Sequence, residues 1–511
     1  MQPLQQLAWT LPENLVLSDL QVSLANTFDL KSGPVKKNIR RWYDTFDWRL
    51  FRADRLLKRE GSNWILQDFD GNDLHTLKSG QKIFHFSRQF PESPLRTALE
   101  KILDVRALIE LGRADVRSMQ LGILNRDSKI VAQLEMEEVT RRRQGHRLVA
   151  VRVQEIRGYA KWFEKVAACI RAFGAEVRAD STDILRFILQ ESGREPLDYS
   201  SGYDVPLDPG MKSIEAIALI YRFLLNNIQC NEQGVIDDID TEFLHDLRVA
   251  VRRTRSGLSL IKDVLDAEVS RRYKKEFKYI GGITGPVRDL DVYLLSRGSY
   301  TARLPKRLRR GMDYFFEDIK TRRWQEQRKL VHLLEGKRYQ QILTDWAKML
   351  DDESGLPPGE NSDVPIAILA GKIIHKRFRR VLRDGTKIHK NTPDRDLHCL
   401  RIECKKLRYS LEFFSSLYNQ EQMKQLIKQL KMLQNNLGDF NDLSVQQQML
   451  ADYLTQIRPR TVKSRELAAS IGGLMTDLNR QHSEVRAHFE STFAHFSRRK
   501  NLDLYHKIFN R

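Results

Sequence analysis

The spacing of apolar positions divides the chain into two regions with different secondary structure. In the first 190 residues, aromatic and β-branched residues gather in two stretches, 35–70 and 119–156, which are broken by turn sequences and predict strands. Apolar residues at helical spacing in 94–111 and 159–173 predict helices between and after them. We therefore expect the first region to be an α+β domain.

From residue 211 onward the pattern changes to long amphipathic helices with few strand-like runs. Residues 191–210 are rich in Gly, Ser, Asp and Pro and are typical of a linker. A similar stretch at 351–365 divides the helical region into halves of about equal length. The sequence thus predicts a multidomain protein with a first domain at 1–195, a linker at 196–206 and a helical domain at 207–511, whose halves lie at about 207–350 and 366–511.

The two helical halves repeat each other in sequence. A His-x-x-Arg segment followed by a basic cluster begins at His245 and returns at His398, an offset of 153 residues. The same offset relates the basic residues that follow in each half, with no gap across the run. A register kept over this length predicts a duplicated helical unit that packs as a pseudo-symmetric pair.

Each copy carries basic side chains on one helical face. At about 100° per residue, the His and three basic residues of each motif fall within an arc of roughly 80°, with apolar residues opposite. A second basic stripe, at i, i+4 and i+7, follows in each copy. The candidate anion-binding residues are His245, Arg248, Arg252, Arg253, Arg255, Arg271, Lys275 and Lys278 in the first copy, and His398, Arg401, Lys405, Lys406, Arg408, Lys424, Lys428 and Lys431 in the second.

These side chains have the chemistry of a phosphate-binding surface. Like charges at i, i+4 destabilise a helix by a few tenths of a kcal/mol, so we expect a bound anion to compensate. Arg offers planar forks that match phosphate oxygens, and Lys adds mobile point charges. The predicted ligand is a run of phosphates. A solvated helix face stays open as the alternative for a single stripe, and helix capping stays open for His245 and His398.

The glycines and cysteines of the sequence indicate helix boundaries and no further binding site. Gly285 and Gly438 are expected to end helices, with Asp289 and Asp442 near the start of the next helix as capping residues. The four cysteines form no C-x-x-C pair, so the sequence predicts neither a disulfide framework nor a zinc site.

The charge of the chain indicates an acidic partner. A total of 86 Lys and Arg against 67 Asp and Glu gives a formal net charge of +19, a field that attracts polyanions. Residues 207–511 hold about 54 basic and about 39 acidic side chains, so about +15 of the excess lies there. No apolar run approaches the roughly 18 residues that span a bilayer, and the first residues lack a signal-peptide pattern. We expect a cytoplasmic protein without a membrane partner.

The duplicated motifs resemble the CHAD family, the conserved histidine α-helical domain. Both His-x-x-Arg motifs are followed in order by a second segment, GPVRDLDV from Gly285 and GDFNDLSV from Gly438. The resemblance covers about residues 207–511 and implies an all-α domain of two pseudo-symmetric helical bundles with a basic groove that binds inorganic polyphosphate. The second copy departs from the first at Asn441 and Ser444, where the first has Arg288 and Asp291. The family's binding residues carry over onto His245, Arg248, Arg252, Arg253 and Arg255, and onto His398, Arg401, Lys405, Lys406 and Arg408.

The first domain resembles the CYTH superfamily of triphosphate-tunnel enzymes over about residues 1–195. The resemblance rests on WYDTFDWRL at 42–50, LLKREG at 56–61 and Trp64. It implies a β-barrel tunnel whose opening E-x-E-x-K strand holds a divalent metal over a triphosphate with alternate glutamates. The stretch that corresponds to this strand, 14–23, has no such motif, and the late strand at 151–155 keeps only Glu155 as a carboxylate.

Two other carboxylates, Glu135 and Glu137, alternate onto one strand face, for which solvation is the simpler explanation. We therefore expect a degenerate, inactive tunnel domain with no catalytic residues and no metal site, to which Mg²⁺ would matter only if it were active.

These observations favour a non-enzymatic protein that binds inorganic polyphosphate, needs no cofactor and associates with polyphosphate granules. Two alternatives stay open. One is a Mg²⁺-dependent inorganic triphosphatase of the CYTH type, and the other is a nucleic-acid-binding protein, because a basic groove is indifferent to which polyanion it neutralises. Base stacking requires aromatic residues among the basic ones, and only Tyr409 and Tyr273 come near.

Overall fold

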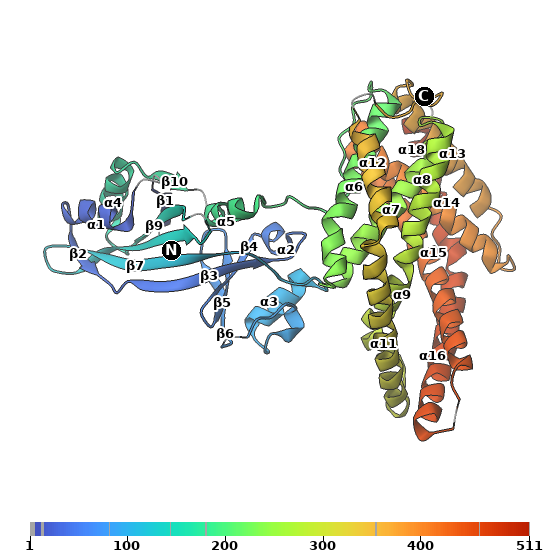
Figure 1. Cartoon of the computed structure of the whole chain (residues 1–511), viewed down its shortest axis with the longest axis horizontal. Coiled ribbons are helices and arrows are strands. Elements are labelled where there is room, and N and C mark those ends of the chain that lie inside the picture. The colour runs from blue at the N-terminus through green and yellow to red at the C-terminus, as the bar shows by residue number, and fades with distance from the viewer. Residues whose placement is uncertain are drawn as a thin grey trace. The chain divides into compact units, whose positions relative to one another are not determined.

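The computed structural model describes residues 6–11, 15–80, 82–143, 145–178, 181–352, 355–458 and 460–509. The chain divides into two compact units, Met1–Ser201 and Gly202–Arg511 (Figure 1). The first unit is built on a sheet and the second consists of helices. Among the described residues, every helix is too short or too polar to span a bilayer.

The first unit is a ten-stranded sheet in which every strand pairs with its neighbours in antiparallel fashion. The strand order is β10-β1-β9-β8-β7-β3-β4-β5-β6, and β2 pairs with β7. The strands are β1 Gln6–Thr10, β2 Asp29–Ser32, β3 Lys36–Asp44, β4 Arg55–Glu60, β5 Asn63–Asp68, β6 Asp73–Lys78, β7 Ile109–Leu124, β8 Ile130–Arg141, β9 Arg147–Glu155 and β10 Glu176–Arg178.

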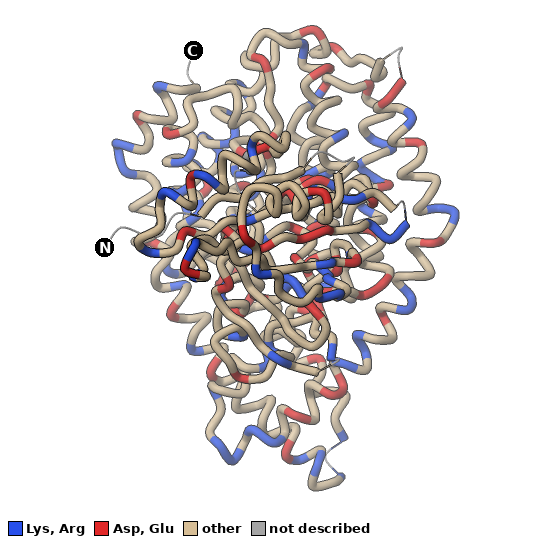
Figure 2. The backbone as a smooth tube through the Cα atoms, turned by 90° about the vertical axis from the view of Figure 1, so that its left-hand side faces the viewer, with Lys and Arg blue, Asp and Glu red and all other residues tan. Residues whose placement is uncertain are grey.

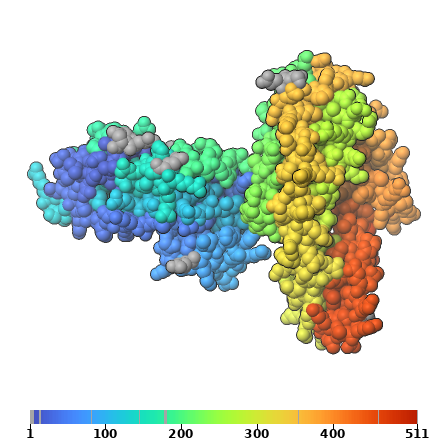
Figure 3. Space-filling view, viewed as in Figure 1, coloured from blue at the N-terminus to red at the C-terminus, as the bar shows by residue number. Residues whose placement is uncertain are grey.

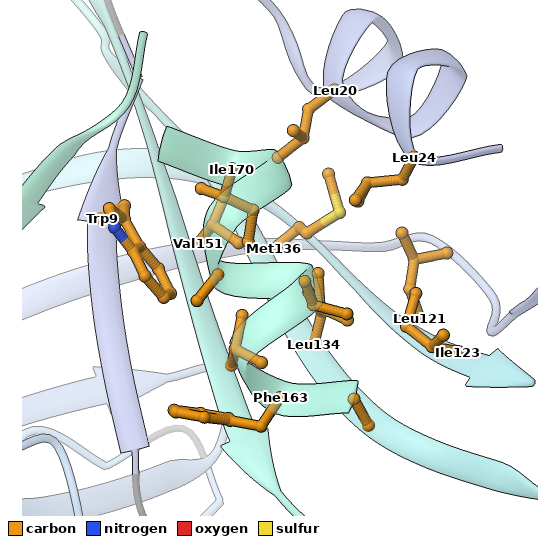
Figure 4. Close-up of a cluster of buried hydrophobic side chains, with 14 of the residues drawn as sticks. Trp9, Leu20, Leu24, Leu121, Ile123, Leu134, Met136, Val151, Phe163 and Ile170 are labelled. Atoms are coloured by element: carbon orange, nitrogen blue, oxygen red, sulfur yellow. The ribbon is translucent and has the colours of Figure 1, made fainter. Parts of the chain in front are cut away.

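Two helices cover one face of this sheet and build its main core. Leu20 and Leu24 of α1 and Phe163 and Ile170 of α4 are buried against Leu134 and its neighbours on the strands (Figure 4). The apolar residues of α1 and α4 recur at i, i+4 and i, i+7, which places them on one helical face. The helices of this unit are α1 Leu17–Ala25, α2 Arg49–Arg52, α3 Pro94–Leu103, α4 Ala160–Ala172 and α5 Thr182–Leu189, with short 3₁₀ turns η1 Ser87–Gln89 and η2 Gln190–Ser192.

The opposite face of the sheet is polar and curls around a cavity. Side chains alternate along β8, so Leu134 enters the core while Glu135 and Glu137 line a cavity of about 560 Å³. Lys58 of β4 and Arg152 of β9 line the same cavity. Because three strands separate β4 from β9 in the sheet, both can border one cavity only if the sheet is strongly curved. The unit is a curled antiparallel half-barrel with packed helices, which confirms the predicted α+β fold of the first domain.

The first strand of the N-terminal unit, β1, lies earlier in the chain than the resemblance to the CYTH superfamily predicted. The segment 14–23 was expected to hold this strand, but Leu17–Ala25 forms helix α1, and Asn14 lies outside the described residues. The position between β9 and β10 in the sheet is taken by β1, on which Trp9 enters the core and Ala8 borders the cavity. Strand β1 supplies no glutamate to the cavity, because its sequence is QLAWT.

The second unit consists of two sets of helices related by the sequence repeat. Helix α6 starts at residue 213 and α13 at 366, and the 20-residue helices α7 and α14 start at 241 and 394, so both pairs keep the offset of 153. The first set is α6 Ser213–Ile236, α7 Thr241–Leu260, α8 Ala267–Ile283, α9 Gly285–Leu295, α10 Arg297–Arg303, α11 Arg309–Leu334 and α12 Lys337–Asp351, with η3 Lys306–Leu308. The second set is α13 Ile366–Gly385, α14 Asp394–Phe413, α15 Gln420–Thr455, α16 Val462–Ala487, α17 Phe489–Phe496 and α18 Arg499–Phe509, with η4 Ser415–Leu417.

Helices of the two halves pack directly against each other. Figures 1 and 3 show α11 and α16 side by side, and Phe315 and Phe316 of α11 share a buried cluster with Ile471 and Leu474 of α16. Helices α7 and α14 also adjoin. The halves are therefore parts of one helical domain, as the predicted pseudo-symmetric pair requires.

The copies differ where α8 and α9 correspond to the single helix α15. Gly285 begins α9, and Pro286 in its first turn has no backbone N–H and obstructs continuation of the preceding helix. The second copy has Asp439 at the matching position, and Gly438 costs a continuous helix only about 1 kcal/mol. The expectation that Gly438 ends a helix is wrong. Asp442 consequently lies inside α15 and caps nothing.

Candidate functional site

The basic stripe of the first copy lies on α7 with its apolar face buried. Asp240 caps this helix, since its carboxylate accepts hydrogen bonds from the backbone N–H groups of Glu242 and Phe243 at 2.9 and 3.3 Å. Leu247 is fully buried, whereas Arg252 on the other side is exposed. Lys and Arg recur along the helices of this unit with Asp and Glu interspersed (Figure 2).

Arg248 fastens α7 to the end of α8. Its guanidinium donates hydrogen bonds to the carbonyl oxygen of Gly281 at 2.9 Å and to the Thr284 hydroxyl at 2.8 Å. Carbonyl groups in the last turn of a helix lack partners within the helix, so a cation there is favourable. The guanidinium group of Arg248 therefore has a structural role, because it links α7 to the last turn of α8.

Four guanidinium groups gather around this position. Burial lowers the pKa of Arg248, and Arg252, Arg288 and Arg255 lower it further, while Asp289 raises it. Arg288 of α9 was not among the predicted site residues. The sequence repeat places Arg288 opposite Asn441, a difference between the copies that does not by itself predict a site residue.

The second copy has an equivalent arrangement on α14 and α15. Arg401 pairs with Asp442 at 3.3 Å, and Nδ1 of His398 lies 2.7 Å from Oδ1 of Asn441. In the first copy, the negative charge of Asp289 raises the pKa of Arg248. The aspartate of the second motif segment thus faces the arginine of the His-x-x-Arg motif in both copies, which replaces the capping role expected from the sequence.

The stripes of the two copies meet at Arg252 and Lys405. Burial lowers the pKa of Lys405 to about 8, and positive charges on Arg401, Arg252 and Arg408 contribute, while Asp442 opposes them. Because Arg252 belongs to α7 and Lys405 to α14, cations from both copies act on one another directly. The structure therefore brings the two predicted stripes together.

The carboxylate of Glu412 links the two copies through an ion pair between α14 and α7. Glu412 of α14 accepts from Arg253 of α7 at 3.1 Å and from Arg408 at 2.5 Å. The side chains of Arg253 and Glu412 are only 11% and 13% exposed. The guanidinium of Arg253 also lies over the ring of Tyr203 at 5.5 Å. Arg253 is therefore part of the domain's interior and does not extend the exposed stripe.

The structure does not bring the other predicted site residues together with Arg252 and Lys405. Lys406 pairs with Glu403 at 2.6 Å, and His398 is exposed. His245 is half-buried in the first turns of α7. The outer stripes are exposed on α8 and α15, and these are Arg271, Lys275, Lys278, Lys424, Lys428 and Lys431.

The cavity of the N-terminal unit holds carboxylates that are already neutralised. Arg40 of β3 donates to both carboxylate oxygens of Glu137, at 2.8 and 2.5 Å, and its Nε lies 2.6 Å from Glu60. Burial alone would raise the pKa of Glu137, but Arg40 lowers it to about 2. Glu135 is 3.5 Å from Arg152, and Lys58 is 3.5 Å from Glu60.

These residues do not fit the divalent metal of a triphosphate tunnel. A divalent metal needs carboxylates that are free to coordinate it. Here Glu60 and Glu137 both form ion pairs with the Arg40 guanidinium. Within the described ranges, no group of three or more His, Cys, Asp or Glu side chains is placed to hold a metal ion. The cavity is a neutral ion-pair network, and we derive no metal-dependent step from it.

Comparison with known proteins agrees with the helical architecture. Residues 220–451 match the family model of the CHAD domain. These residues therefore form a CHAD domain, as the sequence resemblance predicted. A search of the curated proteins found no match.

Three solved structures are similar to parts of the chain. The CHAD domain from the plant Ricinus communis is 25% identical, with 58% of this chain and 95% of that chain covered and a TM-score of 0.48. PptA from Streptomyces chartreusis is 15% identical, with 55% and 99% covered and a TM-score of 0.44. HpAC1 from Hippeastrum, for which a dominant triphosphatase activity is described, is 13% identical, with 39% and 100% covered and a TM-score of 0.26.

Proposed function

We propose that the chain binds inorganic polyphosphate through the facing stripes of its CHAD domain. The observation that carries this proposal is the packing of α7 against α14, through which the charge of Arg252 lowers the pKa of Lys405. Neighbouring cations repel one another, and an anion bound between them offsets this repulsion. A linear polyanion can neutralise both stripes at once.

The length of the stripes favours a polymer over a single phosphate. The segment from His245 to Arg255 covers ten residue steps, or about 15 Å along the helix. A polyphosphate that follows one stripe can reach the other, and this second contact is intramolecular with a high effective concentration. Triphosphate reaches only a few of the same side chains.

The placement of the aromatic residues argues against nucleic acid. Tyr409 is 8% exposed and stacks on Phe413, and Tyr273 is 3% exposed and lies 4.3 Å from the ring of Trp346. Both rings near the stripes are committed to the core, whereas base stacking requires accessible faces. We therefore favour a ligand that consists of phosphates without bases.

Salt should weaken polyphosphate binding steeply. In this proposal six basic side chains of the two stripes contact the polymer and displace its counterions, so we expect the affinity to fall by about 10³-fold between 50 and 200 mM salt. They are Arg248, Arg252, Arg255, Arg401, Lys405 and Arg408. Isothermal titration of the full chain at several salt concentrations measures this slope. Binding that does not change with salt would contradict an electrostatic mechanism.

Lys405 should make binding depend on pH above about pH 8. Its pKa in the free protein is lowered to about 8, and a bound polyanion favours the charged form, so binding takes up a proton when the pH exceeds this value. We expect the affinity of the unsubstituted chain to fall about tenfold between pH 7 and pH 9. Lys405→Arg, which stays charged, should remove most of this fall. An equal fall in the variant would assign the pH dependence to another group.

The N-terminal unit should hydrolyse inorganic triphosphate at less than about 1 per second with Mg²⁺ or Mn²⁺. The reason is that Arg40 already neutralises Glu60 and Glu137. Phosphate release measured with each metal tests this expectation. Turnover at ordinary enzyme rates that Glu137→Gln abolishes would show that the cavity is an active site and would favour the triphosphatase alternative.

A further inference from the structure

A second cationic surface lies between the first and last helices of the second half, α13 and α18. These helices border a cavity of about 1560 Å³, which the residues after η4, Tyr418 and Asn419, also line. Among the described residues that line it there is no Asp or Glu. Its Lys and Arg side chains are Lys372, Lys376, Arg379, Arg380, Arg383 and Lys507.

Most of these charges lie on one face of α13. Lys372, Lys376, Arg379 and Arg383 follow the spacing i, i+4, i+7 and i+11, which covers about 16 Å of one helical face. All four are exposed. Arg383 is paired with the neighbouring Asp384 at 2.8 Å. The other three present their charge to the cavity.

The sequence repeat shows that this charge is particular to the second copy. The first copy also has a cavity beside its first and last helices, α6 and α12, with a volume of about 720 Å³. Its lining includes the acidic side chains of Glu232, Asp351 and Asp352. At the offset of 153, the five cations of α13 correspond to the uncharged residues Leu219, Phe223, Asn226, Asn227 and Cys230. The fold itself therefore does not require cations here.

Two histidines face each other in the same cavity. The rings of His375 on α13 and His506 on α18 are 5.7 Å apart, and both line the cavity. Nδ1 of His375 is buried and has no hydrogen-bond partner among the described residues. Apolar side chains border the same space, including Ile368, which is 51% exposed.

We propose that the cavity between α13 and α18 is a second anion-binding site, which takes the phosphate chain of a small molecule. The helix supplies a row of cations for two or three phosphates, and the imidazoles supply hydrogen-bond donors. The volume exceeds that of a phosphate ion, and the apolar wall suits a ligand with a non-polar part. This site is separate from the facing stripes and does not depend on them.

Binding at this site should strengthen as the pH falls. Burial lowers the pKa of His375, and the charges of His506 and Arg379 lower it further. A bound phosphate opposes these effects, so phosphate binding and protonation of His375 favour each other. The groups that face His375 are Lys372, Lys376 and Arg379 on α13, His506 and Lys507 on α18, and Tyr418 after η4, while Glu403 of α14 is held by Arg377 and Arg380.

The test uses the full chain with two probes, inorganic tripolyphosphate and ATP, titrated by calorimetry at pH 6 and pH 8. We expect K376A/R379A to bind both probes at least about tenfold more weakly than the unsubstituted chain at pH 6, and His375→Gln to lose the preference for pH 6. R252A/K405A, which alters the facing stripes, should keep this binding. Tighter binding of ATP would identify a nucleotide as the better ligand, and equal binding would identify the phosphate chain alone.

The proposal is overturned if K376A/R379A binds both probes as the unsubstituted chain does, or if R252A/K405A removes their binding. All these side chains are exposed or half-buried, and circular dichroism checks that each variant is folded. If K376A/R379A fails to fold, K372A/K507A replaces it with the same expectation. Long polyphosphate provides the separate readout for the stripes: its binding should survive in K376A/R379A, so the two proposals can fail independently.

Discussion

Removal of three basic side chains from either stripe is expected to weaken binding of long polyphosphate about 100-fold. A loss of about 2.8 kcal/mol, or about 0.9 kcal/mol for each of the three phosphate contacts, accounts for this factor. Triphosphate should lose less than about tenfold, because it spans too few of these positions to use both stripes. The two variants are R248A/R252A/R255A and R401A/K405A/R408A.

A matched variant controls for the loss of net charge. Lys306, Arg307 and Arg310 are exposed on η3 and the start of α11, and their replacement by Ala removes the same charge from a surface outside the stripes. This variant should bind long chains within about threefold of the unsubstituted protein. If one stripe variant binds normally while the other loses all affinity, the two copies do not share a ligand.

Glu412→Gln is expected to destabilise the helical unit by about 3–5 kcal/mol. The substitution removes the carboxylate that pairs with Arg253 in the interior and with Arg408 at the surface, and loss of one partner from a buried ion pair is costly. Urea denaturation followed by circular dichroism measures the change in the free energy of unfolding.

Glu421→Gln is the matched control for this substitution. Glu421 also pairs with a basic side chain, Lys424 at 3.4 Å, but both are largely exposed, so we expect a loss of less than about 1 kcal/mol. R253M/E412Q, which replaces both members of the buried pair, should recover part of the stability. Equal destabilisation by Glu412→Gln and Glu421→Gln would show that Glu412 does not join the two copies.

The helical repeat could be predicted from sequence because its signal is long and local. An unbroken offset of 153 residues fixed the correspondence of α7 with α14, and the apolar positions of each helix fixed which side is buried. The contact between the stripes could not be predicted in this way. It depends on the packing of α7 against α14, which brings Arg252 to Lys405 across 153 residues of chain.

The predictions for Arg253 and Gly438 fail for identifiable physical reasons. The family resemblance carried Arg253 over as a binding residue beside Arg252, but Arg253 pairs with Glu412 in the interior. A glycine predicts a helix end only when its surroundings also interrupt the helix, and Pro286 does so after Gly285 whereas Asp439 does not after Gly438.

The cationic face of α13 was missed for a different reason. Its spacing is as regular as that of α7, but it has no counterpart in the first copy, so the sequence repeat does not mark it. In the N-terminal unit, the strand positions of Glu135 and Glu137 were correct. Their neutralisation was not predictable, because Arg40 and Arg152 come from other strands.

We propose that the facing stripes recognise a chain of phosphates. A competition titration of the full chain at fixed salt tests it most directly, with labelled long polyphosphate displaced by unlabelled polyphosphate, triphosphate or single-stranded DNA at equal phosphate concentration. We predict that polyphosphate competes at least about tenfold more effectively than either of the others. Equal competition by single-stranded DNA would contradict the claim and identify a surface that binds any polyanion.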